Sequence, residues 1–281
     1  MSARVLLAAA LTLLPFGAGA QERVLAIGGS VTEIVYRLGE QGRLVGRDAT
    51  SSYPAEVEAL PDIGYMRALS PEGVLSVSPE LILMEAGAGP AETLDTLASA
   101  GVKTVTVPDE FSPAGVLAKV RSVAEALGVP EKGEALAADL DARMQETLAK
   151  VAAESGPAPR VLFILGNSGG RLMGAGRDTA AAAMIELAGG VSAIDSFAGY
   201  KALTDEAIAV AAPDVILAME RGEGAGAHGS DEYITHPALA QTPAGQGEHV
   251  VRMPGMFLLG FGPRTPEAIA ALHAALYPDA P

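Results

Sequence analysis

The stretch ALSPEGVLSVSPELIL at residues 68–83 recurs without a gap as ALTDEAIAVAAPDVIL at residues 202–217. Six of the sixteen positions are identical, and each copy has a Ser or Thr two residues before a glutamate and nine residues before a proline. The hydroxyl residue predicts the start of a capped helix, and the proline-led apolar run predicts a buried strand. We therefore expect one supersecondary unit to occur twice, once in each half of the chain.

The segments before the two copies also correspond, as RVLAIGG at residues 23–29 and RVLFILG at residues 160–166. In the first half, short apolar runs begin at Val24, Leu44, Leu81 and Val105, and helix-like segments separate them. Ser30 and Glu33 have the spacing of a capping box at the start of the first helix. Strands that alternate with helices in this way predict α/β halves with a mostly parallel sheet.

A long amphipathic segment separates the halves. Residues 131–154 carry Leu136, Leu140, Met144, Leu148 and Val151 on one stripe, which predicts a helix about 35 Å long. The expected organisation is a signal peptide (1–20), an N-terminal α/β lobe (21–128), a linking helix (129–156) and a C-terminal α/β lobe (157–281). Two lobes on one helix leave a cleft, a common place for a small-molecule site. The loops GGS and GNSGG, which follow the first strand of each lobe, are expected on its walls.

The N-terminus and the composition narrow the function classes. Arg4, the apolar run to Leu14 and the small residues Ala18-Gly19-Ala20 are typical of a secretory signal peptide. We predict an exported, soluble mature chain that begins near Gln21. The net charge of −15 disfavours nucleic acid as a partner. The absence of cysteine excludes disulfides, thiolate metal sites and cysteine nucleophiles.

The short stretch GYMR at residues 64–67 places a phenol on a glycine corner, with an arginine two residues later. If the stretch is extended, the side chains of Tyr65 and Arg67 point to the same side. A nearby guanidinium favours the anionic form of a phenol. From these residues alone a half-buried tyrosine at a turn is the favoured interpretation, and a ligand site is the alternative.

Nearly the whole mature chain resembles the haem-binding periplasmic substrate-binding proteins of ABC haem importers. The resemblance runs through residues 23–83, VLFILGNSGG, DTAAAAMIELAGG and the C-terminal LLGFGPRTPEAIAALHAALYP, with GYMR and GFGPR as the segments closest to haem binders. It implies two Rossmann-like lobes bridged by one long helix, and no enzymatic activity. The implied cargo is ferric haem b. The implied partners are an ABC permease dimer with its ATPase and an outer-membrane haem receptor system upstream.

The resemblance also assigns roles to residues. It implies that Tyr65 is the axial iron ligand, that Arg67 supports its phenolate, and that Glu72 and Glu206 dock onto the permease. Some relatives add a histidine near GNSGG, but this chain has Asn167 there, so a five-coordinate iron is expected. Arg171, Arg177, Lys201 and Arg264 are candidate partners for the propionates, with Arg264 preferred. Met173, Met253 and Met256 could pack against the porphyrin face, but a place in the core is favoured for each.

Two other functions compete with haem binding. The same scaffold serves carriers of ferric siderophores and of cobalamin, although the 4% aromatic content disfavours their aromatic-walled sites. The segment GNSGG also matches the nucleophile elbow of a hydrolase, with Ser168 as nucleophile. No helix start follows it at once, which disfavours the hydrolase. The four histidines lack the spacing of a metal site, and a distal ligand from the glycine-rich segment at His228 and His236 stays a remote alternative.

Overall fold

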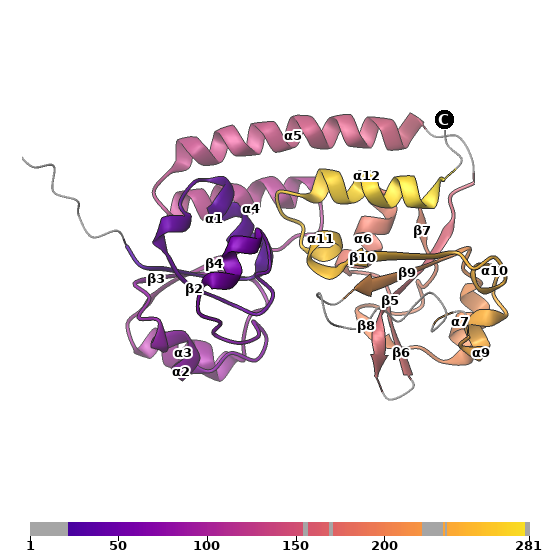
Figure 1. Ribbon diagram of the computed structural model, residues 1–281, viewed down its shortest axis with the longest axis horizontal. Coiled ribbons are helices and arrows are strands. Elements are labelled where there is room, and N and C mark those ends of the chain that lie inside the picture. The colour runs from indigo at the N-terminus through magenta and orange to yellow at the C-terminus, as the bar shows by residue number, and fades with distance from the viewer. Residues whose placement is uncertain (1–21, 154–156, 169–170, 221–232, 234, 279–281) are drawn as a thin grey trace, which may run out of the picture.

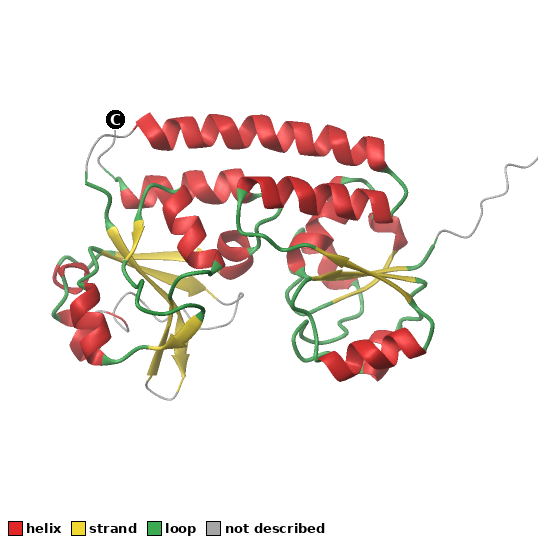
Figure 2. Cartoon of the chain, turned by 180° about the vertical axis from the view of Figure 1, so that it is seen from behind, coloured by secondary structure: helices red, strands yellow, loops and turns green. Residues whose placement is uncertain are grey.

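The computed structural model describes residues 22–153, 157–168, 171–220, 233 and 235–278 (Figures 1 and 2). The predicted signal peptide lies outside these residues. Within the described part of the chain, no helix is both long enough and apolar enough to cross a bilayer.

The first lobe is a four-stranded parallel sheet with helices on both faces. The strand order is β2-β1-β3-β4, formed by β1 (Val24–Ile27), β2 (Leu44–Arg47), β3 (Leu81–Glu85) and β4 (Lys103–Val107). On one face lie α1 (Gly29–Arg37) and α4 (Pro113–Ala126), and on the other α2 (Pro71–Ser76) and α3 (Ala91–Ser99) (Figure 1). The 3₁₀ turns η1 (Gln41–Arg43) and η2 (Ala55–Ala59) complete it. The central strands β1 and β3 are fully buried, as their continuous apolar sequence predicts.

The second lobe repeats this plan with an added antiparallel hairpin. Its sheet has the order β10-β9-β5-β6-β8, and a short strand, β7, pairs with β5. The strands are β5 (Arg160–Ser168), β6 (Arg171–Ala175), β7 (Val191–Ser192), β8 (Tyr200–Ala202), β9 (Val215–Glu220) and β10 (Val250–Pro254). The helices are α6 (Ala180–Leu187), α7 (Asp205–Ala211), α9 (Pro237–Ala240), α10 (Pro243–Gln246), α11 (Gly255–Leu259) and α12 (Thr265–Leu276).

Helix α5 (Pro130–Ala153) runs along one edge of the molecule above both lobes (Figure 1). It packs against α4 of the first lobe and α12 of the second. Leu140 and Met144 of its predicted stripe are buried, and Leu136, Leu148 and Val151 pack on the same core cluster. That cluster is continuous from Val24 in the first lobe to Leu276 in the second. The predicted fold class, two α/β lobes bridged by one long helix, is confirmed.

The two copies of the repeated unit contain equivalent hydrogen bonds. Ser70 caps α2 by accepting from the Gly73 N–H, and Thr204 caps α7 by accepting from the Ala207 N–H. The residues that turn each helix into the following strand, Ser78 and Ala212, share the left-handed conformation, with φ of 47° and 38°.

The arginines that begin the two lobes also correspond. Arg23 donates from its side chain to the carbonyls of Val77 and Ser78, at the end of α2. Arg160 donates to the carbonyl of Ala211, at the end of α7. Each guanidinium therefore satisfies carbonyls that the helix leaves free at its C-terminus, and it fixes the repeated helix against the first strand of its lobe.

The predicted capping box at Ser30 and Glu33 is wrong. Gly28 is the N-cap of α1 and no side chain caps this helix. The Ser30 hydroxyl donates instead to a carboxylate oxygen of Glu85, and Glu33 accepts from Arg264 of the second lobe. Tertiary partners have replaced the local ones, because both side chains are buried where the lobes meet.

Candidate functional site

Tyr65 stands at a tight turn between η2 and α2. Gly64 has a left-handed φ of 99°, and the Ala68 N–H donates to the Tyr65 carbonyl at 2.8 Å. The stretch is thus a turn and not the extended segment that the sequence suggested. Met66 is nevertheless buried, while Tyr65 (45% exposed) and Arg67 face solvent. Arg67 Nη1 donates to the Tyr65 hydroxyl at 3.4 Å, so the corner presents a phenol and a guanidinium together.

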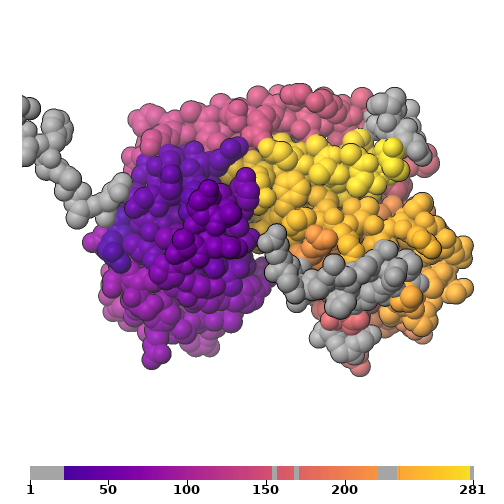
Figure 3. Space-filling view, viewed as in Figure 1, coloured from indigo at the N-terminus to yellow at the C-terminus, as the bar shows by residue number. Residues whose placement is uncertain are grey.

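The second lobe faces this corner with another tyrosine. Tyr200, the first residue of β8, is 36% exposed, and its ring packs edge-on against Phe163 at 6.2 Å. Burial raises the pKa of its phenol, while the Ala181 N–H and the Arg67 guanidinium of the first lobe oppose that rise. A notch between the lobes is visible on the side away from α5 (Figure 3).

A buried ammonium forms the floor between the lobes. Lys119 of α4 is 0% exposed. Its Nζ lies 2.7 Å from Asp109 Oδ1, 3.0 Å from Ser30 Oγ and 3.3 Å from the Gly260 carbonyl of the second lobe. Glu85 Oε2 is 3.5 Å away. Burial raises the pKa of Glu85, and the Lys119 ammonium opposes part of that rise. The network joins the loop after β1 to the segment after α11.

Apolar contacts extend this floor on both sides of Lys119. The rings of Phe111 and Phe261 lie 5.4 Å apart, one from each lobe. A Cβ on Gly29 would meet the Met256 methyl at 2.7 Å, and one on Gly262 would meet Ser30 Cβ at 3.1 Å. The predicted GGS loop thus reaches the opposite lobe. Position 29 requires glycine because a Cβ there would also meet the backbone carbonyl oxygen of Thr50 at 2.7 Å.

Sequence reasoning missed Lys119, Asp109, Glu85 and Tyr200. The sequence does contain an indication that Lys119 is buried: it lies with Val116, Val120 and Val123 on the apolar stripe of its helix. A lysine there is buried only if it is paired.

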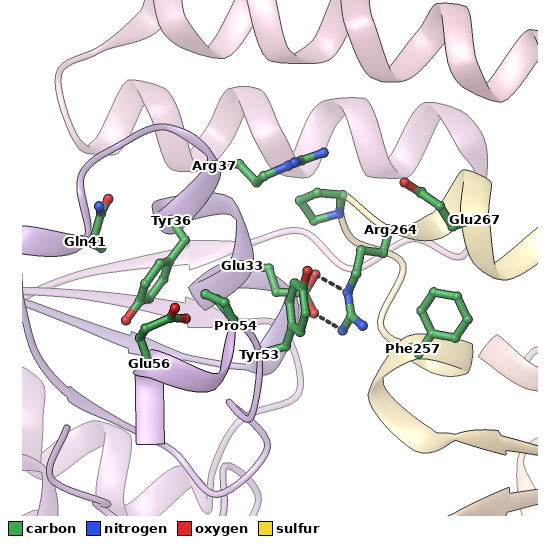
Figure 4. Close-up of a pocket in the computed structure, with 11 residues that line it drawn as sticks. Glu33, Tyr36, Arg37, Gln41, Tyr53, Pro54, Glu56, Phe257, Arg264 and Glu267 are labelled. Atoms are coloured by element: carbon green, nitrogen blue, oxygen red, sulfur yellow. Dashed lines mark hydrogen bonds and ion pairs between the residues drawn. The ribbon is translucent and has the colours of Figure 1, made fainter. Parts of the chain in front are cut away.

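Arg264 lies in a second interlobe contact, beside a pocket of about 730 Å³ (Figure 4). Its Nε donates to Glu33 Oε2 at 2.9 Å, and its guanidinium stacks on the Tyr53 ring at 3.8 Å, with Phe257 at 5.2 Å. Burial raises the pKa of Glu33, and the bond to Arg264 opposes it. The guanidinium therefore already has an anionic partner in the first lobe, and a propionate would have to share it.

The other predicted cargo contacts are scattered over the second lobe. Asn167 is exposed near the end of β5, and Arg171, Arg177 and Lys201 are exposed, with Lys201 stacked over Phe197 at 5.2 Å. Met253 is a core residue, whereas Met256 reaches Gly29 across the lobes. The structure therefore brings together Tyr65 and Arg67 and adds Tyr200, but it leaves Arg264 with Glu33.

Glu72 and Glu206 occupy equivalent places on the two lobes. Each lies in the first turn of its capped helix, α2 or α7, and each is exposed. Both helices lie on the side of the molecule away from α5 (Figure 1). An acidic residue in a first helical turn is favoured by the helix dipole whatever else it does.

The structure bears on two alternatives from the sequence, a hydrolase with Ser168 as nucleophile and a metal site formed by histidines. Ser168 ends β5 and pairs with Arg171 across an antiparallel hairpin, so GNSGG is not the strand-to-helix elbow of a hydrolase. Among the described residues no group of His, Asp and Glu side chains could hold a metal ion. His273 of α12 is half-buried, and its Nδ1 lies 3.0 Å from the Ala188 carbonyl oxygen. The segment with His228 lies outside the described residues.

Comparison with known proteins agrees with this architecture. The profile of a family described as periplasmic binding protein matches residues 24–256. The solved structure of the periplasmic heme-binding protein BhuT, in complex with two hemes, has a TM-score of 0.85 and 42% identity, covering 91% of this chain and 97% of BhuT. Three further solved structures of periplasmic heme-binding proteins align over 92% of this chain.

Curated relatives extend the comparison to transporters of other cargo. YvrC of Bacillus subtilis, an uncharacterized ABC transporter substrate-binding lipoprotein, is 25% identical over 92% of this chain and 81% of its own length. A vitamin B12-binding protein of Yersinia pestis is 35% identical over 92 residues, a third of each chain. The matched family consists of binding proteins, in agreement with the prediction of no enzymatic activity.

The buried network predicts a large loss of stability when Lys119 is replaced. Lys119→Met keeps the apolar stem but leaves Glu85 and Asp109 without their cation, and such a loss costs about 3 to 5 kcal/mol. Urea unfolding at neutral pH measures it. Lys103→Met, at an exposed lysine of β4, is the matched control and should change stability by about 0.5 kcal/mol or less. Equal stabilities for the two variants would contradict the interpretation of Lys119.

The raised pKa of Glu85 predicts a pH dependence with a definite sign. A carboxyl whose pKa is raised in the folded state favours folding while it is protonated, and this contribution is lost as the pH rises above the ordinary value of 4.5. Glu85→Gln cannot titrate, so its stability relative to the native protein should increase from pH 4.5 to pH 7.5. Urea unfolding at four pH values tests this, and parallel profiles would refute it.

Proposed function

The chain belongs to the periplasmic binding protein family, and on that premise we propose that it binds ferric haem b in the interlobe cleft, with Tyr65 as the iron ligand. The observation that carries the proposal is the exposed Tyr65 hydroxyl with the Arg67 guanidinium 3.4 Å away. The heme-binding proteins of the same fold support haem as the cargo. BhuT, the 42% identical relative, holds two hemes.

The chemistry of this corner suits an oxidised iron porphyrin. A free phenol titrates near pH 10, so it needs help to become anionic at neutral pH. The iron supplies most of that help, and the positive charge of Arg67 favours the phenolate further. The turn is already fixed by the Ala68 to Tyr65 hydrogen bond, so little ordering of this loop is required when cargo binds.

Recognition of the propionates requires local positive charge in an acidic protein. We assign Arg264 and the amide of Asn167 to this role, with Arg171, Arg177 and Lys201 as further cations on the second lobe. Arg264 is held by Glu33 in the structure, so its contribution would be a shared charge and not a free guanidinium.

The proposed physiological role is delivery of haem to an ABC permease dimer and its ATPase in the inner membrane. The N-terminal segment is assigned as a signal peptide that directs the chain to the periplasm, and an outer-membrane haem receptor system is the proposed upstream donor. The similarity to an ABC transporter substrate-binding lipoprotein supports this pathway. The paired helices α2 and α7, each with an exposed glutamate, offer two similar contacts to a permease with two subunits.

A cobalamin carrier is the alternative cargo assignment, supported by the vitamin B12-binding relative. That match covers only a third of the chain, whereas the heme-binding structures align over more than nine tenths of it. The sequence contains no tryptophan. Large aromatic walls around a corrin ring would therefore depend on few residues.

Hemin titration tests the ligand assignment. The native protein should give a shifted Soret band and the charge-transfer features of a high-spin tyrosinate complex. Tyr65→Phe should weaken binding of the first equivalent at least ten-fold, or about 1.4 kcal/mol, and remove those features from it. Tyr36→Phe, a tyrosine of α1 in the same lobe, is the control. Native spectra identical to free hemin, together with calorimetric binding of cyanocobalamin, would favour the alternative cargo.

Charge reversal tests the proposed docking residues. Glu72→Arg combined with Glu206→Arg should leave hemin affinity unchanged and abolish stimulation of the cognate transporter's ATPase in proteoliposomes. A control variant reverses two exposed glutamates of α5, Glu134 and Glu146, on the opposite side of the molecule. Stimulation that survives in the Glu72/Glu206 variant would remove these residues from the docking surface.

A further inference from the structure

The two repeated helices each expose an aliphatic side chain beside the glutamate of their first turn. In α2, Leu75 is 36% exposed and follows Glu72 by three residues. In α7, Val210 is 83% exposed and follows Glu206 by four residues. Residues three or four apart lie next to each other on one face of a helix. Each helix therefore presents a carboxylate and an aliphatic group together to solvent.

The fold does not account for these aliphatic groups. Other side chains attach the helices to their lobes, since Val74 of α2 and Ile208 of α7, at equivalent positions of the repeat, are buried. Val210 is more exposed than any other large apolar side chain in the described part of the chain, and a β-branched residue is a weaker helix former than alanine. A single exposed apolar residue is common. Here the exposure recurs in both copies of the repeat, about one helical turn after the glutamate.

The charge around these groups limits which surface can cover them. The chain has a net charge of −15, and Asp205 adds a second carboxylate to the first turn of α7. A second copy of the chain would bring like charges together, and an anionic lipid surface would repel the same carboxylates. A protein surface that combines basic side chains with apolar pockets is complementary to both the acids and the aliphatic groups.

We propose that Leu75 and Val210 are apolar anchors, each of which inserts into an apolar pocket beside a basic residue on one permease subunit. The inference rests on the proposed function, delivery of cargo to an ABC permease. An exposed charge pair adds little net affinity and is screened by salt, whereas burial of an apolar side chain adds affinity in proportion to the area covered. The carboxylates therefore steer and orient the encounter, and the aliphatic groups, Val210 above all, retain the complex.

Alanine substitution tests the anchors without weakening the helices, because alanine is the strongest helix former. Affinity for the cognate transporter in nanodiscs is measured at low salt and at about 0.5 M salt. Val210→Ala should weaken binding about ten-fold and Leu75→Ala about three-fold, with unchanged hemin titrations. At high salt the native protein should still bind, and the double alanine variant should not. Val191→Ala, at an exposed valine of β7 towards α12 (Figure 1), is the matched control and should bind like the native protein.

The outcomes separate the anchors from the proposed function. A double alanine variant that binds like the native protein, while the Glu72→Arg/Glu206→Arg variant loses stimulation, overturns the anchors and leaves docking through the glutamates intact. A native protein that does not bind the transporter overturns the proposed delivery itself. Equal losses in Val210→Ala and Val191→Ala also overturn the anchors. A native dimer in sedimentation that Val210→Ala dissociates would assign the aliphatic groups to self-association and overturn the proposal.

Discussion

One buried ammonium fixes how the two lobes meet. Lys119 carries three protons, and it directs them to a carboxylate and a hydroxyl of the first lobe and to the Gly260 carbonyl of the second. Burying such a charge is costly unless every proton has a partner. The three donor directions are thus satisfied only while the lobes keep this relative position. With α5 packed on both lobes, this floor leaves the two lobes little freedom to move relative to each other.

The repeat explains why the walls are similar. Caps at Ser70 and Thr204, left-handed turns at Ser78 and Ala212, and the clamping arginines Arg23 and Arg160 place equivalent helices and strands on each lobe. Glu72 and Glu206 lie two residues after the cap in both copies. One short segment therefore fixes the capped helix and the following strand of each lobe, together with the exposed glutamate in the first turn of that helix.

What the sequence could predict was local. The strands, the long helix and the caps at Ser70 and Thr204 depend on neighbours within a few residues, and these predictions are confirmed. The predicted capping box is wrong because both side chains bond to distant residues. Glu33 accepts a hydrogen bond from Arg264, which is 231 residues away along the chain, and Ser30 donates to Glu85. Lys119 and Gly260 are 141 residues apart, beyond any periodic pattern.

A rigid cleft has a consequence for release. A donor held in place before binding loses little conformational entropy when cargo arrives, so affinity is gained largely through slow dissociation. A protein with strained or hinged lobes could release cargo by its own opening, but here opening would expose the Lys119 ammonium and separate it from the Gly260 carbonyl. If cargo is held between the lobes as proposed, parting them therefore requires work from outside the chain. The helices α2 and α7 lie at the ends of the lobes remote from α5 (Figure 1), so a permease docked on both helices, as proposed, would act on the two lobes at once.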